Sequence, residues 1–243
     1  MKNQLCFPSL KHTFKFFILT LAAVMISGCA NTTVLKNPAK ITIDTSSPKK
    51  VVVMPMDVEL SLLTASGLTE PKAEWTESAI RFMNAGLKQR LGKSDDKVTF
   101  YKSTATDAQS SLLQLEKLHQ ATGYTILTHD LMMQLPSKKI DKEPRTLGPA
   151  AVELSKQTGA DYGLFIFVRD TYTSGGRAAL MFFAAAAGVG IQGGTQVGFA
   201  SLVDLKTGNI VWFNRLISGT GDLRNEADAD KTISSLMTGF PLN

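Results

Sequence analysis

Cysteine is almost missing from this sequence of 243 residues. The two that are present are Cys6 and Cys29, and none occurs after position 29. The long part of the chain that follows Cys29 therefore forms no disulfide within itself and offers no thiolate ligands for a zinc site. The cysteine at position 29 needs an explanation other than disulfide bonding.

Motifs of catalysis are also lacking. The three histidines, His12, His119 and His129, do not have the His-Glu-x-x-His spacing of a zinc protease. The sequence has no Gly-x-Ser-x-Gly nucleophile turn and no Walker-type phosphate loop, and the glycines at 188–194 lack the acidic partner of a dinucleotide site. We therefore expect no metal site, no cofactor and no catalytic residues.

Three aspartates at the ends of expected strands are the remaining candidates for chemistry. Asp161, Asp170 and Asp204 could meet at one end of a sheet. Aspartates at such positions most often hold turns or cap helices. We predict that the protein is not an enzyme, and an envelope hydrolase acting on peptidoglycan or lipid stays as the alternative.

No apolar run is long enough to span a bilayer, which takes about 20 residues in a helix. Residues 1–15 contain three lysines and no acidic residue, and residues 16–27 (FFILTLAAVMIS) form a short apolar run. A basic segment followed by a short apolar run is typical of a secretory signal peptide. A buried core helix, the other interpretation, would show polar residues along one face.

The residues that end this segment explain the cysteine. Ile26-Ser27-Gly28-Cys29 resembles the lipobox of bacterial lipoproteins. The resemblance implies a diacylglyceryl thioether on Cys29, cleavage after Gly28 and acylation of the new amino terminus, for example with palmitate. Two or three acyl chains would give stable anchoring, whereas one chain is marginal. Alanine at position 30, where an inner-membrane lipoprotein would have aspartate, implies the outer membrane.

The predicted signal peptide divides the chain into three parts. Residues 1–28 are the signal peptide, 29–48 are the lipidated N-terminus and a polar tether, and 49–243 are a single periplasmic domain. The leader carries three lysines, so the formal net charge falls from +5 to +2 when it is removed. A nearly neutral mature chain gives no electrostatic basis for binding nucleic acid.

Hydrophobic periodicity predicts helices between strands in the domain. The expected strands are 51–53, 97–101, 161–173 and 195–205, the last of which enters a hairpin that turns at 206–209. The expected helices are one with Pro71 in its first turn and Gly92 at its end, one from Asp107 to Gly123, one at 149–158, and one that begins near Glu226. We predict an α/β or α+β domain, a mixed sheet with helices packed on it, with a late β-hairpin and a C-terminal helix.

This order of elements resembles a group of periplasmic α/β domains. The resemblance rests on TGADYGLFIFV at 158–168 and SLVDLKTGNIVW at 201–212, followed by a helix. The group includes the amino-terminal domain of the Tol translocation protein, the periplasmic part of the curli secretion channel lipoprotein, the outer-membrane activators of penicillin-binding proteins, and lipoproteins of the neisserial vaccine-candidate type. The resemblance implies an adaptor, an assembly factor or a secretion subunit.

The segment between the two long strands is the most unusual. Residues 178–203 contain no charge, and 178–191 contain no polar side chain. Three interpretations are open: an apolar helix buried in its own domain, an apolar surface that docks on a partner subunit or on lipid, or a membrane hairpin of the curli-channel kind. The lack of alternation counts against the third. Phe182 and Phe183 are the candidates for a protein contact.

Together these observations predict a lipid-anchored protein on the periplasmic face of the outer membrane. We expect it to act as an accessory, adaptor or assembly component of an envelope complex by binding an envelope protein or copies of itself. An oligomeric secretion-channel subunit is a further alternative.

Overall fold

The computed structural model describes residues 31–35, 49–92, 97–102, 111–131, 145–219 and 221–241. Its strands are β1 Asn31–Leu35, β2 Val51–Val53, β3 Asp57–Leu63, β4 Thr69–Pro71, β5 Val98–Phe100, β6 Tyr162–Thr173, β7 Gln196–Asp204 and β8 Ile210–Ser218. Its helices are α2 Ala73–Leu91, α3 Ser111–Leu131, α4 Ala150–Thr158, α5 Gly175–Ala186 and α6 Glu226–Leu236. The fold is α/β with a mixed sheet, a late hairpin and a closing helix, which confirms the sequence-based prediction.

The sheet is organised around the long strand β6. Its strand order is β1-β8-β7-β6-β2-β5, and β3 also pairs with β6 and carries β4 on its other side. β6 is antiparallel to β7 but parallel to β2 and β3. β2 and β3 follow each other along the same edge of β6, separated by the Met54-Pro55-Met56 stretch. Proline has no N–H for the ladder, so an interruption of the strand is expected at Pro55.

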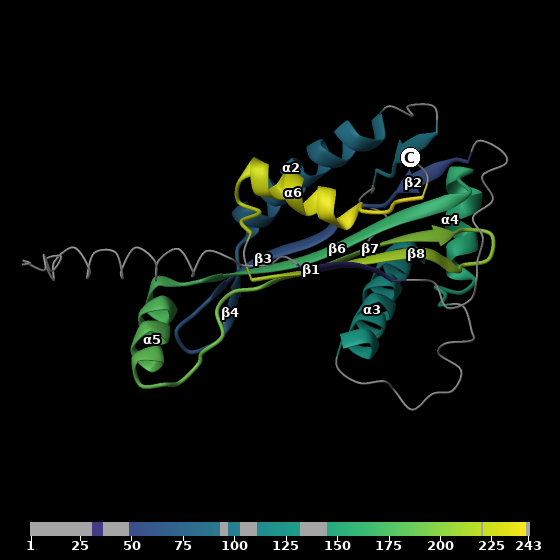
Figure 1. Cartoon of the computed structure of the whole chain (residues 1–243). Coiled ribbons are helices and arrows are strands. Elements are labelled where there is room, and N and C mark those ends of the chain that lie inside the picture. Colours follow the sequence, from purple (N-terminus) through teal and green to yellow (C-terminus); the bar gives the residue numbers. More distant parts are fainter. Residues whose placement is uncertain are drawn as a thin grey trace, which may run out of the picture.

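Helices cover both faces of the sheet (Figure 1). α2 and α6 pack on one face, where Leu164, Ile166 and Val168 of β6 join their core. α3 and α4 pack on the other, where Phe165 and Phe167 point. Neighbouring residues of a strand point to opposite faces, so a strand with both faces covered is a continuous apolar run.

Two helix boundaries differ from the prediction. Pro71 is not in the first turn of a helix but ends the short strand β4, where it pairs with Ser61, and α2 begins after it. Gly123 does not end a helix, because α3 continues to Leu131. A Cβ atom on Gly123 would lie 2.1 Å from Cε2 of Phe199, so this glycine permits close packing of the helix on the sheet.

The predicted tether contains an element of the sheet. β1 pairs antiparallel with β8, from Asn31 opposite Ile217 to Leu35 opposite Phe213. Residues 1–30 and 36–48 lie outside the described residues, so the leader, Cys29 and the rest of the tether stay predictions. In the part of the chain that the structure describes, no helix is long and apolar enough to cross a membrane.

Candidate functional site

The helix α5 follows β6 after a single residue. Ser174 caps it, since its Oγ accepts a hydrogen bond from the backbone N of Arg177 at 3.2 Å. Alanine and leucine, the strongest helix formers, make up much of the helix. It ends at Ala186, Ala187 is its C-cap, and Gly188 follows with φ 78°, a conformation that favours glycine.

No residue of α5 is buried, so of the three interpretations left open, the helix buried in its own domain is wrong. Phe182 is 71% exposed and Phe183 is 69% exposed. The helix lies beyond the end of the sheet, where one of its sides contacts the protein (Figure 1). Arg177, Met181 and Ala184, spaced by four and three residues, are the half-buried residues of that side.

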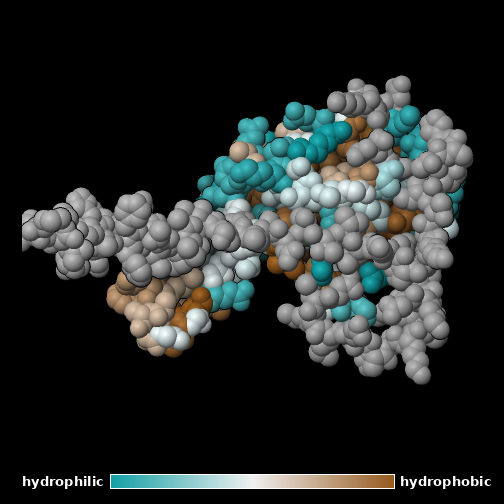
Figure 2. Space-filling view, in the orientation of Figure 1, coloured by the Kyte–Doolittle hydropathy of each residue, from teal (hydrophilic) through white to brown (hydrophobic). Residues whose placement is uncertain are grey.

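The turn between β3 and β4 lies beside α5 and adds to its apolar surface. Leu68 in this turn is 70% exposed, and a Cβ on Gly176 of α5 would lie 3.5 Å from Cβ of Ala65. We define the apolar tip as the five large exposed hydrophobic residues here: Leu68, Leu180, Phe182, Phe183 and Val189. The other three in the described ranges lie on α3, so exposed apolar side chains gather at the tip, which Figure 2 shows as a brown lobe.

Hydrogen bonds that involve the backbone connect α5 to the segment that follows it, and connect that segment to β6. The Arg177 guanidinium donates to the carbonyl oxygen of Gln192 from Nε at 3.0 Å and from Nη2 at 2.7 Å. The backbone N of Gly194 donates to Oγ1 of Thr173 at 2.8 Å. A Cβ on Gly194 would lie 2.0 Å from the carbonyl oxygen of Thr171, so the returning chain needs glycine there. The tip is thus held in a defined position.

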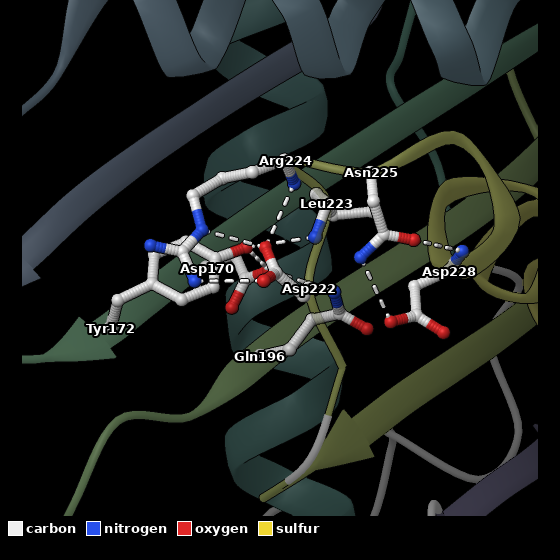
Figure 3. A network of polar contacts seen from close by, with 8 residues as sticks. All are labelled: Asp170, Tyr172, Gln196, Asp222, Leu223, Arg224, Asn225 and Asp228. Carbon is white, nitrogen blue, oxygen red and sulfur yellow. Dashed lines mark hydrogen bonds and ion pairs between the residues drawn. The ribbon is translucent and has the colours of Figure 1, made fainter.

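A buried polar network lies where the sheet meets the chain leading to α6 (Figure 3). Asp170 of β6 accepts hydrogen bonds from the Tyr172 hydroxyl and, at 3.0 Å, from Nε2 of Gln196. The Gln196 Oε1 accepts in turn from Oγ1 of Thr232 on α6 at 3.1 Å. The Tyr172 oxygen also accepts from the backbone N of Leu223 at 2.8 Å. The network joins β6, β7, α6 and the segment before α6.

Arg224 adds an ion pair and two ring contacts to the network. Arg224 donates to both carboxylate oxygens of Asp222, each at 2.7 Å. Its guanidinium also lies over the rings of Tyr172, at 4.1 Å, and Trp75, at 5.0 Å. Arg224 therefore connects α2 to the segment before α6.

The network shifts the pKa values of its members. Burial raises the pKa of Asp170 to about 6, although its hydrogen bonds from Tyr172 and Gln196 act in the opposite direction. Burial also raises the pKa of Tyr172, and the Arg224 guanidinium lowers the pKa of Asp222. Asp170 thus changes its charge near pH 6.

A cleft of about 320 Å³ lies next to the network. Its lining comes from β7, β8, α6 and the segment before α6: Gln196, Leu216, Ser218, Gly221, Asp228, Lys231, Thr232 and Ser235. Four of the polar side chains in it bond within the protein, since Gln196 bonds Asp170 and Thr232, and Lys231 donates to Asp228 at 2.8 Å. The hydrogen bonds of Gln196 connect α6 to the sheet.

The three aspartates predicted at strand ends do not come together. Asp204 lies opposite Tyr162, next to Asp161, whereas Asp170 lies at the other end of the strand pair, opposite Gln196. Asp161 is paired with Lys206 at 3.3 Å. Burial opposes the change, but the hydrogen bond from the backbone N of Lys50 and the interaction with Lys206 lower the pKa of Asp161. Asp204 accepts a hydrogen bond from the backbone N of Lys206 in the hairpin turn. Both have the turn roles expected of strand-end aspartates.

The two histidines of the domain share α3. His119 is buried, stacks on Phe165 with ring centroids 4.9 Å apart, and hydrogen-bonds Oγ of Ser201. Burial lowers its pKa to about 3, so the ring is neutral at ordinary pH. Within the described ranges, no group of three or more His, Cys, Asp or Glu residues is placed to hold a metal ion.

Sequence reasoning missed two parts of these sites. Strand β3 could have been found, because Val58, Leu60 and Leu62 alternate with polar residues. The polar network could not, since its members are scattered from position 170 to position 232. Cys29 lies outside the described residues.

Comparison with known proteins gives weak likenesses. No family model and no curated protein matches the chain. The solved structures that are similar include the PelC dodecamer from Paraburkholderia phytofirmans, at 13% identity, with a TM-score of 0.40, over 86% of this chain and 96% of that one. Lipoprotein GNA1162 from Neisseria meningitidis matches at 15% identity, with a TM-score of 0.30, over 79% of this chain and 96% of that one.

The C-terminal domain of LpoB from Salmonella enterica matches at 15% identity, with a TM-score of 0.26, over 72% of this chain and 85% of that one. Likenesses of this strength do not place the chain in a family and do not transfer a function to it.

Proposed function

We propose that this protein is a lipoprotein of the outer membrane, anchored through acyl chains on Cys29 with its domain in the periplasm. It serves an envelope complex as an accessory or assembly component, and it acts by binding an envelope protein or copies of itself rather than by catalysis. The lipobox supports the anchor. The apolar tip supports the binding role, and it is the observation that carries the proposal.

The tip exposes a large apolar area for a protein surface that faces water. A phenylalanine buries about 150–250 Å² when it is covered, and Phe182 and Phe183 both have most of their surface open. Their rings meet edge to face, with centroids 5.6 Å apart, so they form one continuous surface. Exposed apolar patches of this kind mark sites of interaction. Phe182 and Phe183 are our candidates for the binding surface.

The rival function, an envelope hydrolase, would need a carboxylate of raised pKa open to substrate. Asp170 has the raised pKa but is 2% exposed and lies behind Gln196. Asp228 lines the cleft, but its hydrogen bonds from Lys231 and Asn225 lower its pKa. The arrangement of these two groups favours binding over hydrolysis.

The anchor is tested by mass spectrometry of the native protein. We expect a chain that begins at Cys29 and carries a diacylglyceryl thioether, and we expect a Cys29→Ser variant to keep its leader and to lack acyl chains. An unmodified Cys29 in the wild-type protein would refute the anchor.

The binding role is tested by crosslinking the full chain in intact cells. We expect the variant Phe182→Ser/Phe183→Ser to be made in normal amounts and to lose a crosslinked protein that the wild type captures. The matched control is Leu113→Ser/Leu118→Ser on α3, whose side chains are 37% and 41% exposed. The same crosslinked products from all three proteins would contradict a role of the tip in binding.

A further inference from the structure

The apolar tip presents its surface around most of the helix α5. After the first turn, the exposed residues of the helix and its cap are Ala178, Ala179, Leu180, Phe182, Phe183, Ala185, Ala186 and Ala187. At 100° per residue they cover roughly 220° of the circumference, and none is polar. A helix that docks in a protein groove shows a single stripe of anchors at i, i+3, i+4 and i+7. A helix apolar on nearly all sides is suited to a surrounding apolar medium.

The segments that form the tip contain no charged side chain apart from Arg177. No charged residue occurs in 60–69, which contains the β3–β4 turn, or in 178–203. The cation within the helix, Arg177, is bonded to the carbonyl oxygen of Gln192 on the side that faces the protein. Charged residues begin again at Glu70 in β4 and at Glu59 in β3, behind the tip. The five residues of the tip can therefore leave water without burying a carboxylate or an ammonium group of their own.

The first described residue lies at the same end of the sheet as the tip. Asn31 pairs with Ile217, Ile217 with Val197, and Val197 with Arg169, which is five residues before Ser174 at the start of α5. Cys29 is two residues before Asn31, and two residues of chain span at most about 7 Å. Acyl chains on Cys29 would hold this end of the sheet against the bilayer.

We infer that the apolar tip inserts into the lipid leaflet that holds the anchor, with α5 lying across the end of the sheet in the membrane interface (Figure 1). This rests on the proposed anchor at Cys29. Interfacial helices bury their apolar side about 5–10 Å into the boundary between headgroups and acyl chains. Lipid then covers Phe182 and Phe183, and a protein that contacts them does so within the leaflet.

The test places a tryptophan in the tip and a quencher in the lipid. The full-length lipoprotein with Phe182→Trp is reconstituted in vesicles of phosphatidylethanolamine and phosphatidylglycerol, with or without bromine on the acyl chains. The wild type, with Trp75 and Trp212, provides the background. The matched control is Leu118→Trp on α3, where the native side chain is 41% exposed. Phe183→Trp serves as a second reporter should the first variant not fold.

We expect the emission of the tip tryptophan to shift to shorter wavelength in vesicles and to be largely lost with brominated lipid, while the Leu118→Trp emission persists. An unquenched tip tryptophan would overturn the inference, and so would a blue shift that depends on protein concentration and not on lipid, since a protein then covers the tip. Mass spectrometry of the same sample separates the two proposals. Acylated Cys29 with an unquenched tip refutes insertion alone, and unmodified Cys29 with a quenched tip refutes the anchor alone.

Discussion

The stability of the folded domain is expected to depend on pH through two buried groups that act in opposite directions. His119 takes up a proton near pH 6.5 in the unfolded chain, but its pKa in the fold is about 3 because of burial. Between these values the unfolded chain binds more protons, so stability is intact above pH 6.5 and is lost as the pH falls toward 3. Asp170 behaves in the opposite way. Its pKa rises from 3.8 to about 6 on folding, so stability is gained as the pH falls from 6 toward 4.

The magnitudes follow from these pKa values. From pH 7 to pH 5, His119 lowers the free energy of unfolding by about 2 kcal/mol, and Asp170 raises it by about 1 kcal/mol. The wild type should therefore lose about 1 kcal/mol or less over this interval. His119→Gln, which stays neutral, should instead gain about 1 kcal/mol on acidification, and Asp170→Asn should lose about 2 kcal/mol. Carboxylates with a lowered pKa, such as Asp222, contribute little because they titrate below pH 4.

Urea unfolding followed by tryptophan fluorescence at pH 5 and pH 7 measures these differences, because each variant is compared with itself at the two pH values. Any loss of packing in a variant is the same at both pH values and cancels. Slopes of the same sign in His119→Gln and Asp170→Asn would refute the reasoning, as would a wild-type slope unchanged by His119→Gln.

Three further predictions concern packing and polar contacts. Gly123→Ala should destabilise the fold by about 1–3 kcal/mol, because the new methyl group meets the Phe199 ring. Gly92→Ala should be nearly neutral, because no heavy atom lies within 4 Å of the added Cβ. Thermal unfolding of the two variants compares these effects. Tyr172→Phe should cost about 1–3 kcal/mol in urea unfolding, since the buried Leu223 N–H loses its acceptor, and an unchanged midpoint would argue against the network. Arg90→Ala should lower the free energy of unfolding by about 1 kcal/mol or less, because the ion pair of Arg90 with Asp230, between α2 and α6, is partly exposed. The loss should decrease as the salt concentration rises. A loss that does not change with salt would indicate a packing effect instead.

The fold could be predicted from the sequence where a residue pattern is compatible with a single kind of local structure. The apolar run that begins at Tyr162 predicted a strand, which is β6, and Gly159, with φ 66°, marked the end of α4 as expected. Gly123 was misread because glycine ends helices and also permits close packing, and the sequence does not distinguish the two. Pro71 was misread in the same way, since proline is suited both to a first helical turn and to an edge strand.

The candidate site was harder to predict for a different reason. Composition showed that 178–191 is apolar, and a helix was among the interpretations, but burial depends on which elements lie next to it in space. The pairing of β6 with β7 ends at Asp170, opposite Gln196, whereas β3 stays paired with β6 to Thr173, so the helix that follows β6 has protein on one side. Phe182 and Phe183 are the aromatic residues of that run, and both are exposed. Asp170, Gln196 and Thr232 meet through tertiary structure alone, and no local pattern marks them.

The pairing of β1 with β8 has a consequence for biosynthesis. Asn31 and Ile217 are partners although nearly the whole described chain lies between them. Ribosomes deliver the N-terminus first, so β1 waits without its partner until the last hairpin has emerged. A chain cut short before position 210 would leave the backbone groups of β1 and β7 unpaired, and open strands of this kind recruit other chains into aggregates.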